Sequence, residues 1–215
     1  MIQIQPGPVV PQRYLDAVAG RDPLELSSKA HKRLRHLIEG LSEKELEWSP
    51  GPGKWSIKQV LAHLADGEVI NGSRLRFVAA MDRPTIVGYD QDAFIANLCV
   101  DQLSAEEWLD AFRSMRALNV ALLSRLPKEA FAKVGMHSER GEESLGHMVF
   151  LYAGHDIVHE RQIAALLLAY KADRKARHAA EQARRDAKEL AKAEKKANKK
   201  RTKGRQSKGK PAKVS

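Results

Sequence analysis

The sequence predicts an all-α protein built as a four-helix bundle, and three observations support this prediction. Apolar residues recur at intervals of three and four in the segments 25–39, 57–81, 93–126 and 142–170, as in helices that bury one face. No segment shows the apolar–polar alternation that is typical of a half-buried strand. The chain has 215 residues, of which 43% are hydrophobic, and this is enough for one domain with its own core.

The chain begins with an irregular lead and a first helix. Residues 1–24 carry three prolines within the first eleven positions, which oppose regular structure and leave room only for a short turn near residues 12–19. The first helix is predicted over residues 25–39, where the apolar residues share one face. Gly40 follows as its end.

The second and third helical regions carry capping signals at their starts. Ser56 and Gln59 are spaced as a capping box, in which a hydroxyl and an amide bind free backbone N–H groups at the start of the helix 57–81. The region 93–126 is expected to form one or two helices, with Ser104 as an N-cap.

The fourth helix, residues 142–170, is long and apolar, and the composition changes directly after it. We therefore assign residues 25–170 to the bundle and residues 171–215 to a basic tail. The tail contains 18 Lys and Arg and five Asp and Glu, whereas the rest of the chain has a net charge of −3. Its composition predicts a solvated helix up to about Lys200 and disorder beyond it.

The charge distribution limits the partners of the protein. A body with a net charge of −3 excludes a basic nucleic-acid-binding fold for the first 170 residues. The tail, residues 171–215, has the cations for nonspecific contact with nucleic acid or another polyanion, but no aromatic residue that would stack on bases. A solubilising role is equally consistent with this composition.

Other features exclude secreted and membrane proteins. The single cysteine, Cys99, rules out an intramolecular disulfide framework, suits a reducing compartment, and is expected to be a small buried side chain. No run approaches the roughly 20 apolar residues of a membrane span, and no secretory signal is visible within the lead, which has no basic segment before an apolar stretch. The sequence therefore predicts a cytoplasmic protein without a membrane span.

Three histidines are candidates for metal ligands. His155 and His159 are four residues apart, so both rings leave one face of the last helix. The alternative for this HxxxH pair is two polar side chains on a solvent-exposed or hydrogen-bonded helix face, without a metal. His63 borders the apolar stripe of the second helix, and Gly67, one turn later, would leave room for a ligand beside it. A core-edge histidine that donates to a carbonyl is the alternative for His63.

Three segments in order along residues 25–170 resemble the DinB/YfiT superfamily: PGPGKWSIKQVLAHLADGE, GYDQDAF and LGHMVFLYAGHDIVHERQI. The resemblance implies a metal-binding four-helix bundle that usually forms a homodimer. It also implies that the three-histidine site of the family falls on His63, His155 and His159. Members of known activity include thiol-dependent S-transferases and isomerases that use bacillithiol or mycothiol.

The leading functional hypothesis is therefore a metal-dependent thiol S-transferase, with a small thiol and an electrophile as substrates. A metal-dependent hydrolase is the alternative, and a noncatalytic dimeric bundle with a polyanion-binding tail is the third hypothesis. Three imidazoles suit zinc or nickel, and also iron or copper. Glu68, Asp92 and Gln162 are the candidate catalytic residues. Asp156 is expected at the surface or behind a ligand, and Tyr89 at the lip of a pocket.

Overall fold

The computed structural model describes residues 11–207, with side chains described up to residue 196. The chain divides into two compact units, Met1–Ala169 and Tyr170–Ser215. Within the described part, no helix is long and apolar enough to cross a membrane.

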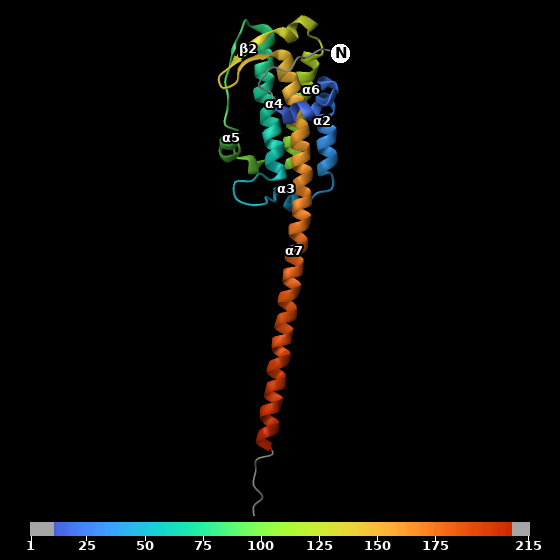
Figure 1. Cartoon of the computed structure of the whole chain (residues 1–215), viewed down its shortest axis with the longest axis vertical. Coiled ribbons are helices and arrows are strands. Elements are labelled where there is room, and N and C mark those ends of the chain that lie inside the picture. The colour runs from blue at the N-terminus through green and yellow to red at the C-terminus, as the bar shows by residue number, and fades with distance from the viewer. Residues whose placement is uncertain (1–10, 208–215) are drawn as a thin grey trace, which may run out of the picture. The chain divides into compact units, whose positions relative to one another are not determined.

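Four long helices form the bundle, which confirms the predicted fold class (Figure 1). They are α2 (Pro23–Ile38), α4 (Ile57–Ala80), α6 (Ala105–Leu123) and the first part of α7 (Leu145–Ser207). Shorter helices connect them: α3 (Glu43–Glu47), α5 (Gln91–Asn97) and the 3-10 turns η1 (Val100–Gln102) and η2 (Lys128–Ala132). The predicted region 93–126 therefore holds α6 together with most of α5 and η1.

Side-chain caps fix the starts of the bundle helices. Ser56 caps α4 and Ser104 caps α6, and both helices have the complete capping box, with Gln59 and Glu107 at the third helical position. Asp22 caps α2 by accepting hydrogen bonds from two backbone N–H groups. Each cap satisfies donors that the helix itself leaves free, and this stabilises a helix by about 1 kcal/mol.

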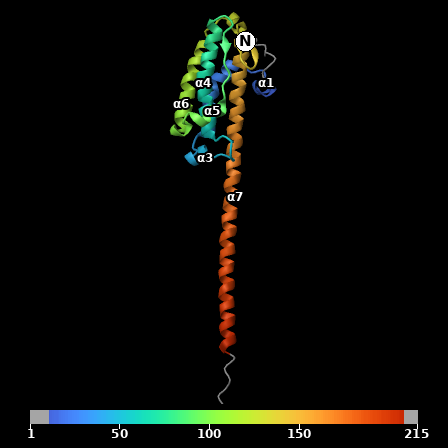
Figure 2. The ribbon, with the colours of Figure 1, turned by 90° about the vertical axis from the view of Figure 1, so that its left-hand side faces the viewer.

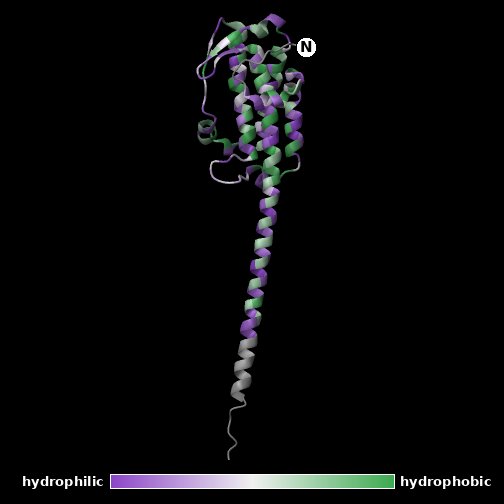
Figure 3. Cartoon of the chain, in the orientation of Figure 1, coloured by the Kyte–Doolittle hydropathy of each residue, from purple (hydrophilic) through white to green (hydrophobic). Residues whose placement is uncertain are grey.

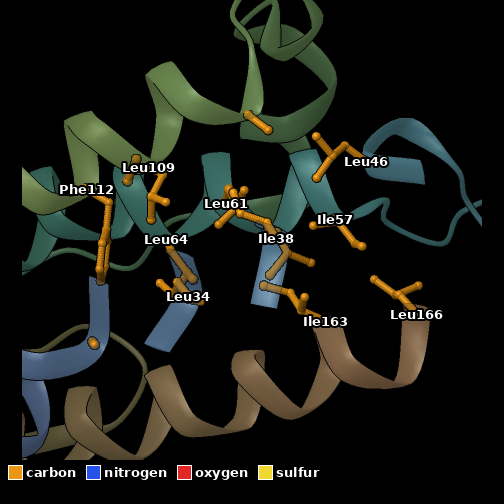
Figure 4. Packing of buried hydrophobic residues seen from close by; sticks show 14 residues of the cluster. Leu34, Ile38, Leu46, Ile57, Leu61, Leu64, Leu109, Phe112, Ile163 and Leu166 are labelled. Atoms are coloured by element: carbon orange, nitrogen blue, oxygen red, sulfur yellow. The ribbon is translucent and has the colours of Figure 1, made fainter. Parts of the chain in front are cut away.

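The main core lies where the four bundle helices meet (Figure 4). Phe112 and Leu34 are fully buried there, and they come from α6 and α2. Leucine and isoleucine side chains surround them, including Ile38, Leu46, Ile57, Leu61, Leu64, Leu109, Ile163 and Leu166. Every bundle helix contributes side chains to this apolar cluster. The cluster therefore holds α4 and α7, which carry the candidate histidines, in a fixed arrangement.

A small sheet covers one end of the bundle, although no apolar–polar alternation in the sequence indicates its strands. The strands are β1 (Thr85–Ile86), β2 (Val134–His137) and β3 (Gly141–Ser144), in the order β1-β2-β3. β1 pairs in parallel with β2, and β2 pairs antiparallel with β3. Strands of two to four residues are too short to show alternation in the sequence. Their pairing is stabilised by a second apolar cluster that includes Ile86, Phe131 and Leu145.

The N-terminal lead contains a helix instead of the expected short turn, so the prediction of an irregular lead was wrong there. This helix, α1 (Gln12–Val18), buries Ala17 and Val18 completely in a third cluster with Ala153 and Ile157 of α7. Figure 2 shows α1 beside the upper part of α7. The close approach needs Gly154, because a Cβ at this position would lie 2.4 Å from the backbone oxygen of Tyr14.

Replacing Gly154 with alanine is expected to destabilise the protein by about 1–3 kcal/mol, because α1 would have to move away from α7. Gly67→Ala is the matched control in another helix. A Cβ at Gly67 would meet only the Asn71 side-chain nitrogen, at 3.8 Å, so this substitution should stabilise the protein by about 0.5–1 kcal/mol. Urea denaturation of both variants would measure the difference. Equal effects would contradict the packing of α1 described here.

The unit Tyr170–Ser215 continues as helix in its described part, through Ser207 at the end of α7. Hydrophilic and weakly hydrophobic residues alternate along residues 170–196 (Figure 3). The expectation of disorder beyond Lys200 was wrong for residues 201–207, because lysine, arginine and glutamine favour helices enough to offset one glycine. Residues 208–215, to which the same expectation applied, lie outside the described part.

Candidate metal centre

Three histidines from two helices converge at one point of the bundle. The Nε2 atom of His155 lies 3.1 Å from Nε2 of His63 and 3.0 Å from Nε2 of His159. His63 comes from α4, whereas His155 and His159 leave the same face of α7, one turn apart. The structure therefore brings together the three residues that the sequence selected.

Burial keeps these imidazoles neutral. Desolvation, followed by the nearby His159, lowers the pKa of His63 to about 3. The pKa of His155 is lowered well below its usual value, first by burial and then by the two neighbouring imidazoles. Burial also lowers the pKa of His159. A neutral imidazole has a free lone pair on one nitrogen, which is the form that binds a metal ion.

Gln162 determines which nitrogen of His159 is free. The Gln162 side-chain oxygen lies 2.7 Å from Nδ1 of His159, so Nδ1 carries the proton and donates it to this acceptor. The lone pair is then on Nε2, the atom that faces His155. Gln162 was a catalytic candidate in the sequence, and the structure places it as the residue that orients His159.

The spacing of the three nitrogens fits a single divalent ion. Metal–imidazole bonds of about 2.0–2.1 Å place neighbouring nitrogens about 2.8–3.0 Å apart at octahedral angles and about 3.3–3.4 Å apart at tetrahedral angles. The two separations to His155 Nε2, 3.0 and 3.1 Å, lie between these limits. Three converging lone pairs repel one another unless a cation or a proton lies between them. The donor set therefore fits a metal with three protein ligands and further open positions.

Two nearby carboxylates belong to a buried ion-pair network and are not free bases. Arg116 of α6 donates to Glu68 over 2.7 Å and forms two hydrogen bonds with Asp156. Asn119 also donates to Glu68, over 2.9 Å. Asp156 is only 1% exposed, so of its two expected places, at the surface or behind a ligand, the structure excludes the surface. Glu68 and Asp156 neutralise Arg116 and connect α4, α6 and α7 behind the histidines.

The third catalytic candidate, Asp92, is exposed in the first turn of α5. Its backbone N–H donates to the side chain of Asp90, which caps this helix. Asp92 does not line the cavity beside the histidines, whereas Tyr89, two residues before the helix, does. Cys99 is exposed instead of buried, because it lies in a left-handed turn between α5 and η1.

A cavity of about 250 Å³ opens beside the histidines. His63 and His155 line it together with Tyr14 of α1, and the ring of Tyr14 lies 5.9 Å from that of His155. The indole ring of Trp55 lies 5.0 Å from His63 on another side. Aromatic rings thus limit access of water to the nitrogens, while the cavity gives a small molecule access to them.

The sequence profile of the DinB superfamily matches residues 27–163, which is more than half of the chain. The chain belongs to the DinB superfamily. The resemblance noted in the three sequence segments is thereby confirmed.

Relatives and a solved structure agree with this assignment. A protein of Bacillus cereus named "Putative metal-dependent hydrolase" is 29% identical over 133 residues, which cover 62% of this chain and 76% of the relative. A relative from Oceanobacillus iheyensis with the same type of name is 28% identical and is covered to 77%. The structure of YfiT from Bacillus subtilis, described as a probable metal-dependent hydrolase with an unusual four-helix bundle topology, superposes with a TM-score of 0.64. That match has 20% identity and covers 75% of this chain and 90% of YfiT.

Several residues around this DinB-type centre were missed by reasoning from sequence. Tyr14 lies in the supposed irregular lead, and His137 in a supposed linker, but both line the cavity. Arg74, Arg140 and Tyr152 line it as well. One signal was present in the sequence. Arg74 follows His63 by eleven residues, and eleven residues are close to three full helical turns, so both lie on one face of α4.

Proposed function

We propose that this DinB protein is a metal-dependent hydrolase whose divalent metal ion is held by His63, His155 and His159. One observation carries the proposal: three neutral imidazoles direct their Nε2 atoms at one point, and this point borders a cavity of about 250 Å³. The names of the relatives and of the YfiT structure support the same reaction class. Zinc or nickel suits three nitrogen ligands best.

The metal would supply Lewis acidity, which polarises a substrate oxygen and makes water a stronger nucleophile at neutral pH. The protein supplies the other requirements. Gln162 keeps Nε2 of His159 unprotonated, while Tyr14 and Trp55 restrict water on two sides. Glu139 is the carboxylate that lines the cavity within the described residues, and it is the group that would accept a proton there.

The thiol S-transferase hypothesis uses the same three histidines and remains a prediction. In that reaction a small thiol would occupy the open position of the metal and attack an electrophile. A homodimer and a polyanion contact through residues 171–215 are likewise predictions. These alternatives differ from hydrolysis in one respect that is simple to measure, because a transferase consumes a thiol and a hydrolase does not.

Metal analysis and turnover assays test the proposal. The untagged full chain and a His63→Ala, His155→Ala, His159→Ala variant would be compared by elemental mass spectrometry after incubation with zinc or nickel. We expect about one metal per chain, absent in the triple variant. A panel of amide, ester and phosphoester substrates should then be hydrolysed without added thiol. No metal in the wild type would overturn the proposal, and turnover only with a thiol would establish the transferase instead.

Gln162→Leu is expected to weaken metal binding about 10-fold to 100-fold, because the proton on His159 would no longer be held at Nδ1. Gln162→Glu keeps an oxygen acceptor at the same position and should retain most of the affinity. Competition with a chromophoric chelator would measure both dissociation constants. Equal affinities in Gln162→Leu and the wild type would show that the hydrogen bond does not orient His159.

A further inference from the structure

Arg74 is a buried cation on the wall of the cavity that contains the candidate metal ligands. The residue is 7% exposed and lines this cavity together with His63 and His155. Because eleven residues separate it from His63 on one face of α4, the two Cα atoms lie about 16 Å apart along the helix axis. Helical side chains tilt toward the N-terminus of their helix, which in α4 is the end that carries His63.

No carboxylate within the described residues neutralises Arg74. Its guanidinium donates to the backbone oxygen of Val87 and lies 5.5 Å from the centre of the Tyr89 ring, and both partners are uncharged. No described Asp or Glu oxygen lies within 4.0 Å of it. This contrasts with Arg116 and with Arg140, each of which is paired with a buried carboxylate. A buried charge without a counter-ion is costly, so proteins rarely retain one without a function.

Two further hydrogen-bond donors line the same cavity. Nδ1 of His137 accepts the backbone N–H of Glu139 at 3.1 Å, and burial lowers the pKa of His137, so its proton lies on Nε2. That Nε2 is buried and has no hydrogen-bond partner among the described residues. Burial raises the pKa of Tyr152 to about 12, which keeps its hydroxyl protonated as a donor. This hydroxyl is also buried; the Arg74 guanidinium is its polar neighbour, and no described group of standard geometry accepts the hydroxyl proton.

We infer that Arg74, His137 and Tyr152 bind an anionic group of the substrate, a carboxylate or a phosphate. The inference rests on the proposed function and narrows its substrate class. The substrate would be a small, extended anion whose reacting bond lies at the three histidines and whose charged group lies toward Arg74. Because Arg140 is already paired with Glu143, it does not compete with Arg74 for this group.

Binding of simple anions to the full chain without metal tests this inference. Thermal unfolding would be followed in chelator with phosphate, with succinate, and with chloride at equal ionic strength. We expect phosphate or succinate to raise Tm of the wild type above its value in chloride. Stabilisation by phosphate alone would identify a phosphate substrate, and by succinate alone a carboxylate substrate. No shift with either anion would overturn the inference.

Variants connect the effect with Arg74. Arg74→Met should weaken anion binding about tenfold or more, because a charge-assisted hydrogen bond is lost. Arg74→Lys keeps the charge and the fold and should bind with intermediate affinity. Arg83→Met is the control, because Arg83 is exposed and paired with Glu142. The basic tail is identical in all variants, so anion binding to the tail contributes equally to each Tm shift and does not affect the difference between variants. Wild-type anion binding in Arg74→Met and Arg74→Lys would overturn the inference.

The metal content of the same samples separates this inference from the proposed function. If the protein binds metal but anions do not raise its Tm, the proposed metal centre stands and only the anion site is refuted. If anions raise the Tm but no metal binds, the anion site stands and the hydrolase proposal is refuted.

Discussion

Replacing His155 with alanine is expected to weaken metal binding at least about a hundredfold and to abolish turnover without unfolding the protein. His155 is the central residue of the cluster, since its Nε2 lies within 3.1 Å of the corresponding atom of both other histidines. Loss of a direct ligand exceeds the 10-fold to 100-fold loss that follows when only an orienting partner is removed. Isothermal titration with zinc or nickel and a turnover assay would measure both effects.

His36→Ala is the matched control for this prediction. His36 lies on α2, is exposed and should influence neither metal affinity nor turnover. Thermal unfolding of metal-free His155→Ala should match or exceed that of the metal-free wild type, because the substitution removes a buried imidazole that faces two others. Unchanged metal affinity in His155→Ala would contradict the assignment of the three histidines as ligands.

Replacing Arg116 with methionine is expected to destabilise the protein by about 3–5 kcal/mol. The guanidinium is 5% exposed and neutralises Glu68 and Asp156, which are 4% and 1% exposed. Without Arg116, two buried carboxylates would remain close together with no cation between them. Chemical denaturation with urea would measure the loss, which should be accompanied by weaker metal binding because the network joins the helices of His63 and His155.

Arg113→Met is the control, because Arg113 precedes Arg116 by one turn on α6 and forms a half-exposed ion pair with Asp110. Its loss should cost at most about 1 kcal/mol. A triple variant, Arg116→Met with Glu68→Gln and Asp156→Asn, should recover part of the stability, since it removes the buried charges together. If Arg116→Met were no more destabilising than Arg113→Met, the network would not have the structural role described here.

The helices that could be predicted are those whose signals are local. The capping box at Ser56 and the N-cap at Ser104 lie where the sequence placed them, and α4 begins and ends within one residue of the prediction. The four-residue spacing of His155 and His159 determines by itself that both rings share a helix face. Caps, helix ends and the direction of a side chain around its helix depend only on residues of that helix, so the sequence pattern is sufficient to predict them.

The residues that could not be predicted depend on contacts between distant segments. α1 was missed because its burial depends on Gly154, more than 130 residues later, which admits the backbone of Tyr14. The strands were missed because two to four residues carry no period, and their pairing depends on the packing of Ile86 beside Gly135. The ion pairs of Glu68 and Asp156 could not be predicted because their partner, Arg116, belongs to another helix.

The sequence by itself thus determined a helical bundle, its caps and the two-histidine face of α7, while His63 was joined to that face through the family resemblance. Only the tertiary structure decided that Nε2 of His155 lies within 3.1 Å of Nε2 of both His63 and His159, that Gln162 orients His159, and that Arg74 shares their cavity without a counter-ion. The physical reason is that periodicity gives the direction of a side chain around its own helix. The distance to a side chain on another helix follows from how the whole core packs.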